Sequence, residues 1–165
     1  MNNSTFYKSS ALPTKLGSNY CGAQVKSLEV QRRVFGEENS ETLDIMQGLG
    51  LLYLKQHEYA QAAETLRKAL TGYQKILSNT WRTHDTESML GAALAAQKKY
   101  SDAEELLLSG YQGMLERQDT LPASERGALE RAGKSIVQLY QDWGKLEQAA
   151  RWRTRLGAAK PSVSP

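Results

Sequence analysis

The chain has 165 residues, a formal net charge of +3 and 40% hydrophobic residues, a composition typical of one soluble globular domain. A single cysteine, Cys21, excludes an intrachain disulfide framework, and two histidines leave little material for a metal site. No apolar run approaches the roughly 20 residues that a membrane-spanning helix needs. The first ten residues lack the basic and apolar segments of a secretory signal, so we expect a cytoplasmic protein.

The N-terminal 23 residues differ in composition from the rest of the chain. They are rich in Ser, Asn, Lys and Gly, and Pro13 interrupts the stretch where a helix would run if the repeat described below continued backward. We therefore expect residues 1–23 to be irregular or disordered. Residues 24–36 are different, because the segment from Leu28 to Phe35 matches residues 70–77 at an offset of 42. They predict the last part of a helix and thus a partial repeat.

Residues 40–78 predict a pair of amphipathic helices. Leu43, Met46 and Leu49 recur at spacings of three and four, which places them on one face of a first helix. A break follows at residues 56–58, and apolar residues at helical spacing resume from Tyr59 to Tyr73. We expect two antiparallel helices joined by this short break.

The same pattern returns twice. Gly50 and Tyr59 recur 41 residues later as Gly91 and Tyr100, which defines a second pair over residues 84–117 with its break at 98–99. Residues 139–149 repeat the second copy at an offset of 46 and define a third pair over 122–157, with its break at 144–145. Gly157 is expected to end the last helix, which leaves residues 158–165 as a tail. The predicted fold class is all-α, an array of antiparallel helix pairs over residues 24–157.

Small residues at fixed places in the repeat predict close helix contacts. Gly50 is expected to face Ala62 within the first pair, and Gly91 is expected to face Ala103 within the second pair. Two further small residues lie on second helices, and we expect them to receive the first helix of the following pair. They are Ala69 and Gly110.

The two-helix unit resembles the tetratricopeptide repeat. Its first helix carries Leu-Gly followed by Tyr, and its second helix carries Tyr-x-x-Ala followed by Ala-Leu. The period of 41–42 and the linker over residues 35–43 resemble the kinesin-light-chain-like variety. This resemblance implies a right-handed superhelical solenoid whose first helices line a concave groove, and a function in protein–protein interaction.

A narrower resemblance rests on residues 80–82, 88–94, 105–114 and 137–145. These segments are similar to the C-terminal repeat end of bacterial proteins in which a Ser/Thr kinase domain precedes a tetratricopeptide array. The resemblance implies a bacterial, kinase-associated fragment of a larger signalling protein. No Gly-rich phosphate loop, His-Arg-Asp or Asp-Phe-Gly motif is present, so we expect no kinase activity from these residues.

No catalytic, metal-binding or cofactor-binding residues stand out, and we expect none. The two histidines, His57 and His84, are both expected in exposed turns, without a second ligand at usable spacing. Three tryptophans are better explained by packing or capping than by partner contact. We place Trp81 in a linker, Trp143 at the end of a first helix and Trp152 in the last helix.

The charge distribution argues against a nucleic-acid partner. Residues 36–117 carry a net charge of −4, although both ends of the chain are basic. An acidic array centre does not provide a continuous track for phosphates. The last helix carries Arg151, Arg153 and Arg155, which suit a helix C-terminus and the polar end of a solenoid.

The leading hypothesis is a non-catalytic scaffold that binds a peptide or helix of a partner protein in the groove. Asp44, Leu51, Ser88 and Ala92 depart from the Lys and Asn pattern with which related arrays clamp a terminal carboxylate, so the expected guest is apolar. By resemblance, the groove residues are Asp44, Gln47, Leu51, Leu54, Lys55, Ser88, Ala92, Ala95, Ala96, Lys134, Gln138 and Gln141.

The alternative hypothesis is a structural role in which the chain self-associates as a homodimer. The face around Leu28 and Val34 would lack a preceding helix pair, and an apolar edge of that kind invites dimerisation.

Overall fold

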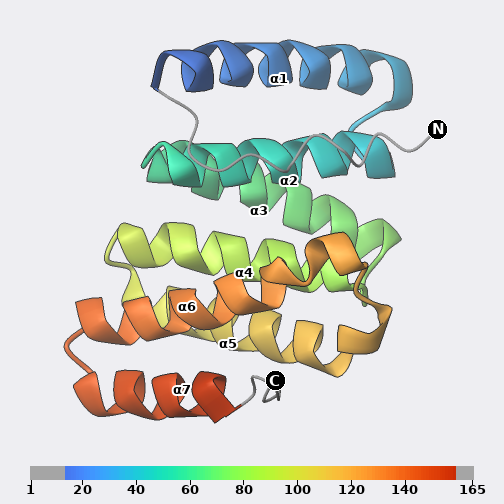
Figure 1. Ribbon diagram of the computed structural model, residues 1–165. Coiled ribbons are helices and arrows are strands. Elements are labelled where there is room, and N and C mark those ends of the chain that lie inside the picture. Colours follow the sequence, from blue (N-terminus) through green and yellow to red (C-terminus); the bar gives the residue numbers. More distant parts are fainter. Residues whose placement is uncertain (1–13, 159–165) are drawn as a thin grey trace, which may run out of the picture.

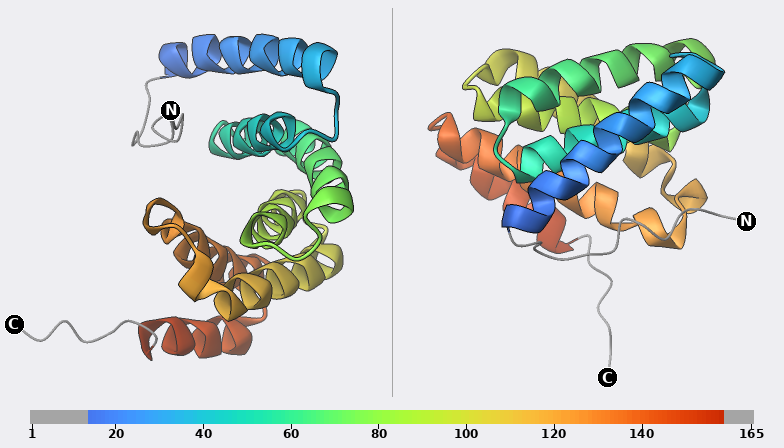
Figure 2. Two further views of the ribbon diagram at one scale, coloured as in Figure 1. Left: turned by 90° about the vertical axis from the view of Figure 1, so that its right-hand side faces the viewer. Right: turned by 90° about the horizontal axis from the view of Figure 1, so that it is seen from above.

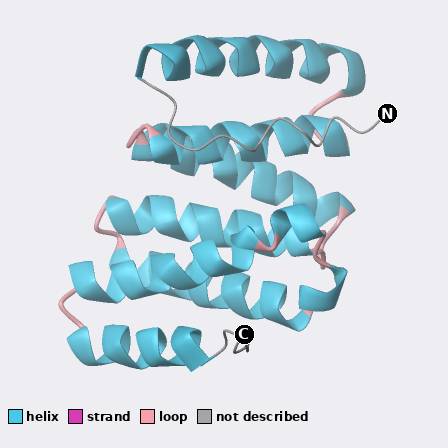
Figure 3. Cartoon of the chain, in the orientation of Figure 1, coloured by secondary structure: helices cyan, strands magenta, loops and turns pink. Residues whose placement is uncertain are grey.

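The computed structural model describes residues 14–158, and side chains from residue 22 onward. These residues form seven α-helices and two short 3-10 helices, without a β-strand among them (Figures 1 and 3). In chain order the helices are α1 (Thr14–Phe35), α2 (Ser40–Lys55), α3 (Tyr59–Ile76), α4 (Trp81–Ala96), α5 (Tyr100–Glu116), η2 (Gln118–Thr120), η3 (Ala123–Glu125), α6 (Gly127–Asp142) and α7 (Leu146–Ala158).

The helices pack as three antiparallel pairs, α2 with α3, α4 with α5 and α6 with α7, and α1 packs against α2. Seen along the helices, the pairs follow an arc, with α2, α4 and α6 on its inner side and α3 and α5 on its outer side (Figure 2). The predicted all-α repeat solenoid is thereby confirmed.

The turn inside each pair has the same backbone geometry in all three pairs. The residue at its centre adopts a left-handed conformation, at φ 62° in His57, 63° in Lys98 and 79° in Gly144. The next residue donates its N–H to the carbonyl five positions earlier, over 2.9 Å from Glu58 to Tyr53, and this bond recurs at Lys99 and Lys145. The breaks expected at 56–58, 98–99 and 144–145 all fall on this turn.

Glycines admit the neighbouring helix at the contacts within each pair. An added Cβ on Gly50 would lie 2.5 Å from Leu66, and a Cβ on Gly91 would lie 2.8 Å from Leu107, the equivalent residue in the second pair. Ala103 also contributes its carbonyl oxygen, 3.1 Å from the same position on Gly91. The small residues of the first helices therefore sit where the second helices cross most closely.

The expectation for the small residues of the second helices was wrong in its direction. A Cβ on Gly110 would lie 2.5 Å from the carbonyl oxygen of His84, so Gly110 of α5 faces α4 of its own pair and not the following pair. Ala69 similarly lies in a buried cluster with Leu43 and Met46 of α2. The closest helix–helix contacts therefore lie within a pair, where the second helix crosses its own first helix.

The N-terminal boundary also differs from the expectation. Residues 14–23, which we expected to be irregular, form the first half of α1, and residues 1–13 lie outside the described part of the chain. A proline is compatible with the start of a helix, because the first turn needs no N–H donor there. Pro13 therefore stands immediately before the first residue of α1 in the sequence.

Candidate interaction groove

The inner side of the arc consists of α2, α4 and α6, the first helices of the three pairs (Figure 2). α4 packs against α6 and also contacts α2. Residues at equivalent positions of the repeat therefore form rows across the three helices. The rows are 44, 85 and 131, then 47, 88 and 134, then 51, 92 and 138, then 54, 95 and 141.

Polar contacts of the first row, which also involve Gln47 and Arg82, connect the three helices. Asp85 of α4 accepts a bond from Gln47 of α2 over 3.1 Å and an ion-paired bond from Arg131 of α6 over 2.7 Å. Asp44 of α2 pairs with Arg82 of α4 over 3.3 Å and accepts a hydrogen bond from the hydroxyl of Tyr73. These contacts fix the spacing of the first helices along the inner wall.

Asp85 is the most deeply buried charged group of this wall, with 6% of its side chain exposed. Burial raises its pKa above the usual value, and the positive charge of Arg131 acts in the opposite direction. Burial together with the charge of Asp44 also raises the pKa of Tyr73. Both groups are partnered, and their contacts connect α2 with α3 and α4 with α6.

The next rows form a floor that changes character along the array. Leu51 and Leu54 of α2 and Ala92 of α4 are half-buried and apolar. At the same positions α6 carries Gln138 and Gln141, both exposed. The inner side of the arc is therefore apolar at its N-terminal end and polar at its C-terminal end.

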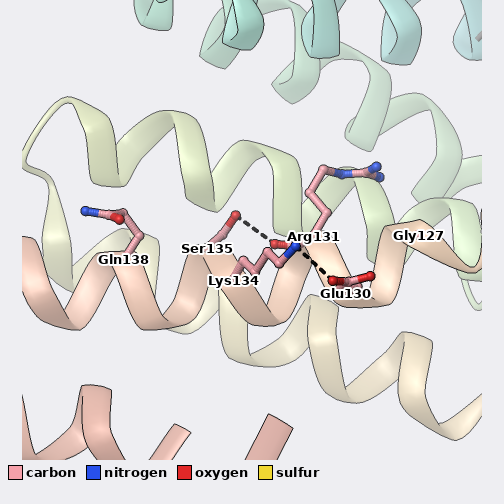
Figure 4. Close-up of a pocket in the computed structure, with 6 residues that line it drawn as sticks. All are labelled: Gly127, Glu130, Arg131, Lys134, Ser135 and Gln138. Carbon is pink, nitrogen blue, oxygen red and sulfur yellow. Dashed lines mark hydrogen bonds and ion pairs between the residues drawn. The ribbon is translucent and has the colours of Figure 1, made fainter. Parts of the chain in front are cut away.

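The polar end contains an open depression of about 450 Å³ on the inner face of α6 (Figure 4). Lys134 in it pairs with Glu130 over 2.8 Å, and Ser135 donates to the carbonyl oxygen of Arg131 over 3.1 Å. The six lining residues follow one another at helical spacing along α6, and they are Gly127, Glu130, Arg131, Lys134, Ser135 and Gln138. This stretch offers charged and amide groups to a ligand.

The twelve residues predicted for the groove all lie on the three first helices, but their side chains differ in exposure. Ser88 and Ala95 are buried, with 3% and 9% of their surface exposed, so they support the wall and offer little surface to a ligand. Half-buried are Asp44, Gln47, Leu51, Leu54 and Ala92, and exposed are Lys55, Ala96, Lys134, Gln138 and Gln141.

Sequence reasoning missed three residues that shape the groove, namely Arg82, Asp85 and Arg131. Asp85 and Arg131 occupy the positions equivalent to Asp44 in the second and third pairs, at offsets of 41 and 46. The repeat register therefore contained the signal, because Asp44 itself was among the predicted residues.

Residues 23–75 match the family model of the tetratricopeptide repeat. Over these residues the chain is similar to the tetratricopeptide repeat, and the described array has the fold of tetratricopeptide-like repeats. The array resembles the solved structure of BtubC (BKLC) from P. vanneervenii with a TM-score of 0.66 and 14% identity over 92% of this chain. It also resembles the kinesin light chain nearly identical TPR-like repeats of Podosopora anserina with a TM-score of 0.66 and 19% identity over 91% of this chain.

A single-residue variant of the same Podosopora anserina repeats gives a TM-score of 0.66 and 18% identity over 87% of this chain. The tetratricopeptide array spans 62% of BtubC, 66% of the variant repeats and 71% of the unsubstituted repeats. At these identities the likeness shows the fold alone, which is that of kinesin-light-chain-like repeats. No curated protein matches the chain significantly.

Aromatic residues of the tetratricopeptide array pack mainly against one another at pair boundaries. Tyr100 of α5 stacks on Trp143 at 5.6 Å between ring centroids, and the ammonium group of Lys145 lies 3.2 Å from the Trp143 centroid. Tyr111 meets Trp152 edge to face at 5.1 Å. These contacts link the second pair to the third.

Two residues expected in loops of the tetratricopeptide array lie in a helix. Trp81 is the first residue of α4, whose start is capped by the side chain of Thr80, and His84 is in the first turn. The Nδ1 atom of His84 lies 3.0 Å from a carboxylate oxygen of Glu87, and the His84 ring packs against Gly113. His57 does lie in a turn, where its ring nitrogen bonds the hydroxyl of Tyr59.

No candidate metal centre assembles in the described part of the array. No set of three or more His, Cys, Asp or Glu side chains within residues 22–158 has the geometry to hold a metal ion. Among these residues, no helix has the length and apolar character needed to cross a membrane. The tetratricopeptide fold is generally non-catalytic and serves as a scaffold for protein–protein interaction.

Proposed function

We propose that this tetratricopeptide array is a non-catalytic scaffold that binds a peptide or helix of a partner protein in its concave groove. The observation that carries the proposal is the inner floor, where the apolar side chains of Leu51, Leu54 and Ala92 remain partly open to solvent. An apolar surface within a concave wall gains free energy when a guest side chain displaces water from it.

The composition of the floor determines which guest fits best. We infer that the small side chain of Ala92 leaves space for a guest above α4, bordered by Leu51 and Leu54 of α2. Bulky apolar side chains of a guest fill such a space, as in other helix-in-groove complexes. Further along, Gln138 and Gln141 provide amide donors and acceptors for the backbone or polar side chains of the same guest.

The polar contacts between the first helices support the same proposal. The contacts among Asp85, Gln47 and Arg131 fix the helices before a guest arrives, and a preorganised wall loses less entropy on binding. None of these contacts involves the apolar floor residues, so binding does not require any of them to break.

We further propose the cellular setting that the sequence resemblance implies. The similarity of residues 80–82, 88–94, 105–114 and 137–145 to arrays that follow a bacterial Ser/Thr kinase domain supports a role as the substrate- or regulator-recruiting part of a cytoplasmic signalling protein. In that setting the array positions a protein for a kinase and performs no chemistry itself. Neither a cofactor nor a nucleic acid has a part in this function.

The test starts from peptides selected by phage display against the immobilised 165-residue protein. Each selected peptide is synthesised with a fluorophore, and its Kd is measured by anisotropy for three proteins. The groove variant carries Leu51→Glu and Ala92→Glu. The control variant carries Leu146→Glu and Ala150→Glu, the same two changes at exposed positions of α7.

We expect the groove variant to weaken peptide binding by about tenfold or more, since two carboxylates then occupy the apolar floor. The control variant should bind as the wild type does. Circular dichroism verifies that both variants remain helical. Unchanged Kd values for the groove variant would contradict the proposed binding mode.

A further inference from the structure

α1 has one covered and one open face. Leu28 is 6% exposed and packs with Leu43 and Met46 of α2. Val30 and Val34 point away from that contact, with 61% and 64% of their surface exposed. The apolar edge expected around Leu28 and Val34 is therefore centred on Val30 and Val34, because Leu28 is already buried. α1 lies at the end of the described array, with α2 beside it (Figure 1).

The repeat register shows what the equivalent face contacts in two other second helices, α3 and α5. α1 corresponds to α3 at an offset of 42, which aligns Val30 with Gly72. A Cβ on Gly72 would lie 2.4 Å from Leu43. The equivalent glycine of α5 is Gly113, where an added Cβ would collide with the ring of His84. In α3 and α5 this position is thus pressed against another helix, and a glycine accommodates a large side chain.

In α1 the pattern is reversed. Val30 presents a branched side chain where α3 and α5 have a glycine, so a helix that packs closely here must offer a small residue opposite it. α1 itself carries such residues on the same face. Ala23 and Ser27 are exposed, and with Val30 and Val34 they follow one another at spacings of four, three and four.

This face is complementary to itself in an antiparallel arrangement. When a second α1 runs in the opposite direction, Val30 lies on Ser27 of the other copy and Val34 lies on its Ala23. Two-fold symmetry repeats both contacts, so four large residues meet four small ones. A parallel or head-to-tail arrangement places the valines against each other or against unrelated residues.

We propose that the protein self-associates as an antiparallel dimer through this face of α1, formed by Ala23, Ser27, Val30 and Val34. The occupant is a second copy of this chain. One helix face makes a small interface, so the dimer is weak and depends on concentration. Lys26 and Arg33 lie beside the valines and give the interface a net positive charge, which salt screens.

The test is sedimentation velocity of the full chain from about 5 µM to about 200 µM, in low and in high salt. We expect the weight-average sedimentation coefficient to rise with concentration, and to rise more at high salt. Val30→Glu with Val34→Glu should abolish the rise. Leu146→Glu at the start of α7, which is 67% exposed, is the control and should leave it unchanged.

A second variant tests the register directly. Ala23→Trp places a large side chain in the small half of the face, at an exposed position that no described helix covers. It adds apolar surface, so a non-specific association would strengthen, whereas the proposed packing weakens by about tenfold or more. Circular dichroism establishes that each variant is folded.

Three outcomes would overturn the proposal. These are a monomer at every concentration, a dimer that survives the two glutamates, and a dimer that strengthens with Ala23→Trp. None of these variants changes the groove, so the peptide affinities described above should be the same in all of them. Failure of the dimer and failure of groove binding are thereby distinguishable.

Discussion

Gly110 provides the sharpest test of the close contact between α4 and α5. In Gly110→Ala the new Cβ lies 2.5 Å from the carbonyl oxygen of His84, 2.7 Å from the backbone nitrogen of Ser88 and 3.0 Å from its Cβ. Ordinary contacts between such atoms are about 3.5 Å or longer. Two of the three neighbours are backbone atoms of α4, so no side chain can rotate away and the helices must separate.

Two terms of opposite sign determine the magnitude. Alanine is favoured over glycine inside a helix by about 1 kcal/mol, which stabilises α5. Overpacking of a tight contact costs about 1–3 kcal/mol or more, and here the backbone contact places the cost at the upper end. We expect the free energy of unfolding to fall by about 1–2 kcal/mol and the Tm to fall by about 2–8 °C.

Urea unfolding followed by far-UV circular dichroism measures the change, with Gly157→Ala as the matched control. Gly157 is exposed in α7, and a Cβ there would meet nothing within 4 Å. The same substitution should therefore stabilise the protein, by up to about 1 kcal/mol. If Gly110→Ala unfolds at the same urea concentration as wild type or higher, the reasoning from the α4–α5 contact is refuted.

Two further predictions use the turns and the inner wall. Lys98→Gly should raise the free energy of unfolding by up to about 1 kcal/mol, and with it the urea midpoint. Lys98 has φ 63°, in the turn where the third pair has Gly144. A lowered midpoint would contradict this prediction. Arg131→Met should cost about 3 kcal/mol at pH 7, because it leaves Asp85 buried without its cation. Burial already raises the pKa of Asp85 above 3.8, so ionisation in the folded state costs stability, and protonation removes that cost. The loss in Arg131→Met should therefore shrink as the pH falls from about 7 toward 5, and a loss independent of pH would show that the ion pair is not its cause.

The helix pairs could be predicted because the residues that define them repeat at fixed offsets. Gly50 and Gly91 mark the same crossing in two pairs, and the structure places each against an equivalent leucine, Leu66 or Leu107. Packing constraints of this kind leave a pattern in the sequence, since a larger residue at the crossing would prevent the second helix from approaching.

The start of α4 was misjudged although the sequence contains a signal for it. Thr80 caps α4 and occupies the position equivalent to Asn39, whose side chain caps α2. Reading the caps in register would have moved Trp81 and His84 from the linker into the helix. The spacing of apolar residues did not predict this helix start, because the first turn of α4 contacts its neighbours through polar groups.

The burial of Asp85 could not be predicted from its own pair. The equivalent Asp44 is half-buried although Arg82 pairs with it from the next pair, whereas Asp85 is contacted from both neighbouring pairs, by Gln47 and by Arg131. Contacts between pairs depend on how far one pair is displaced from the next. That displacement is not encoded in the periodicity of either helix.

The common geometry of the three turns inside the pairs has a consequence for how such a chain lengthens or shortens in evolution. The turns are of one length, with a left-handed residue at 57, 98 and 144. The connections between pairs differ, from residues 77–80 before α4 to residues 117–126, with two 3-10 helices, before α6. The differences in length within this array therefore lie between the pairs, so we expect that one complete pair with its turn intact could be added or removed without altering the packing inside the other pairs.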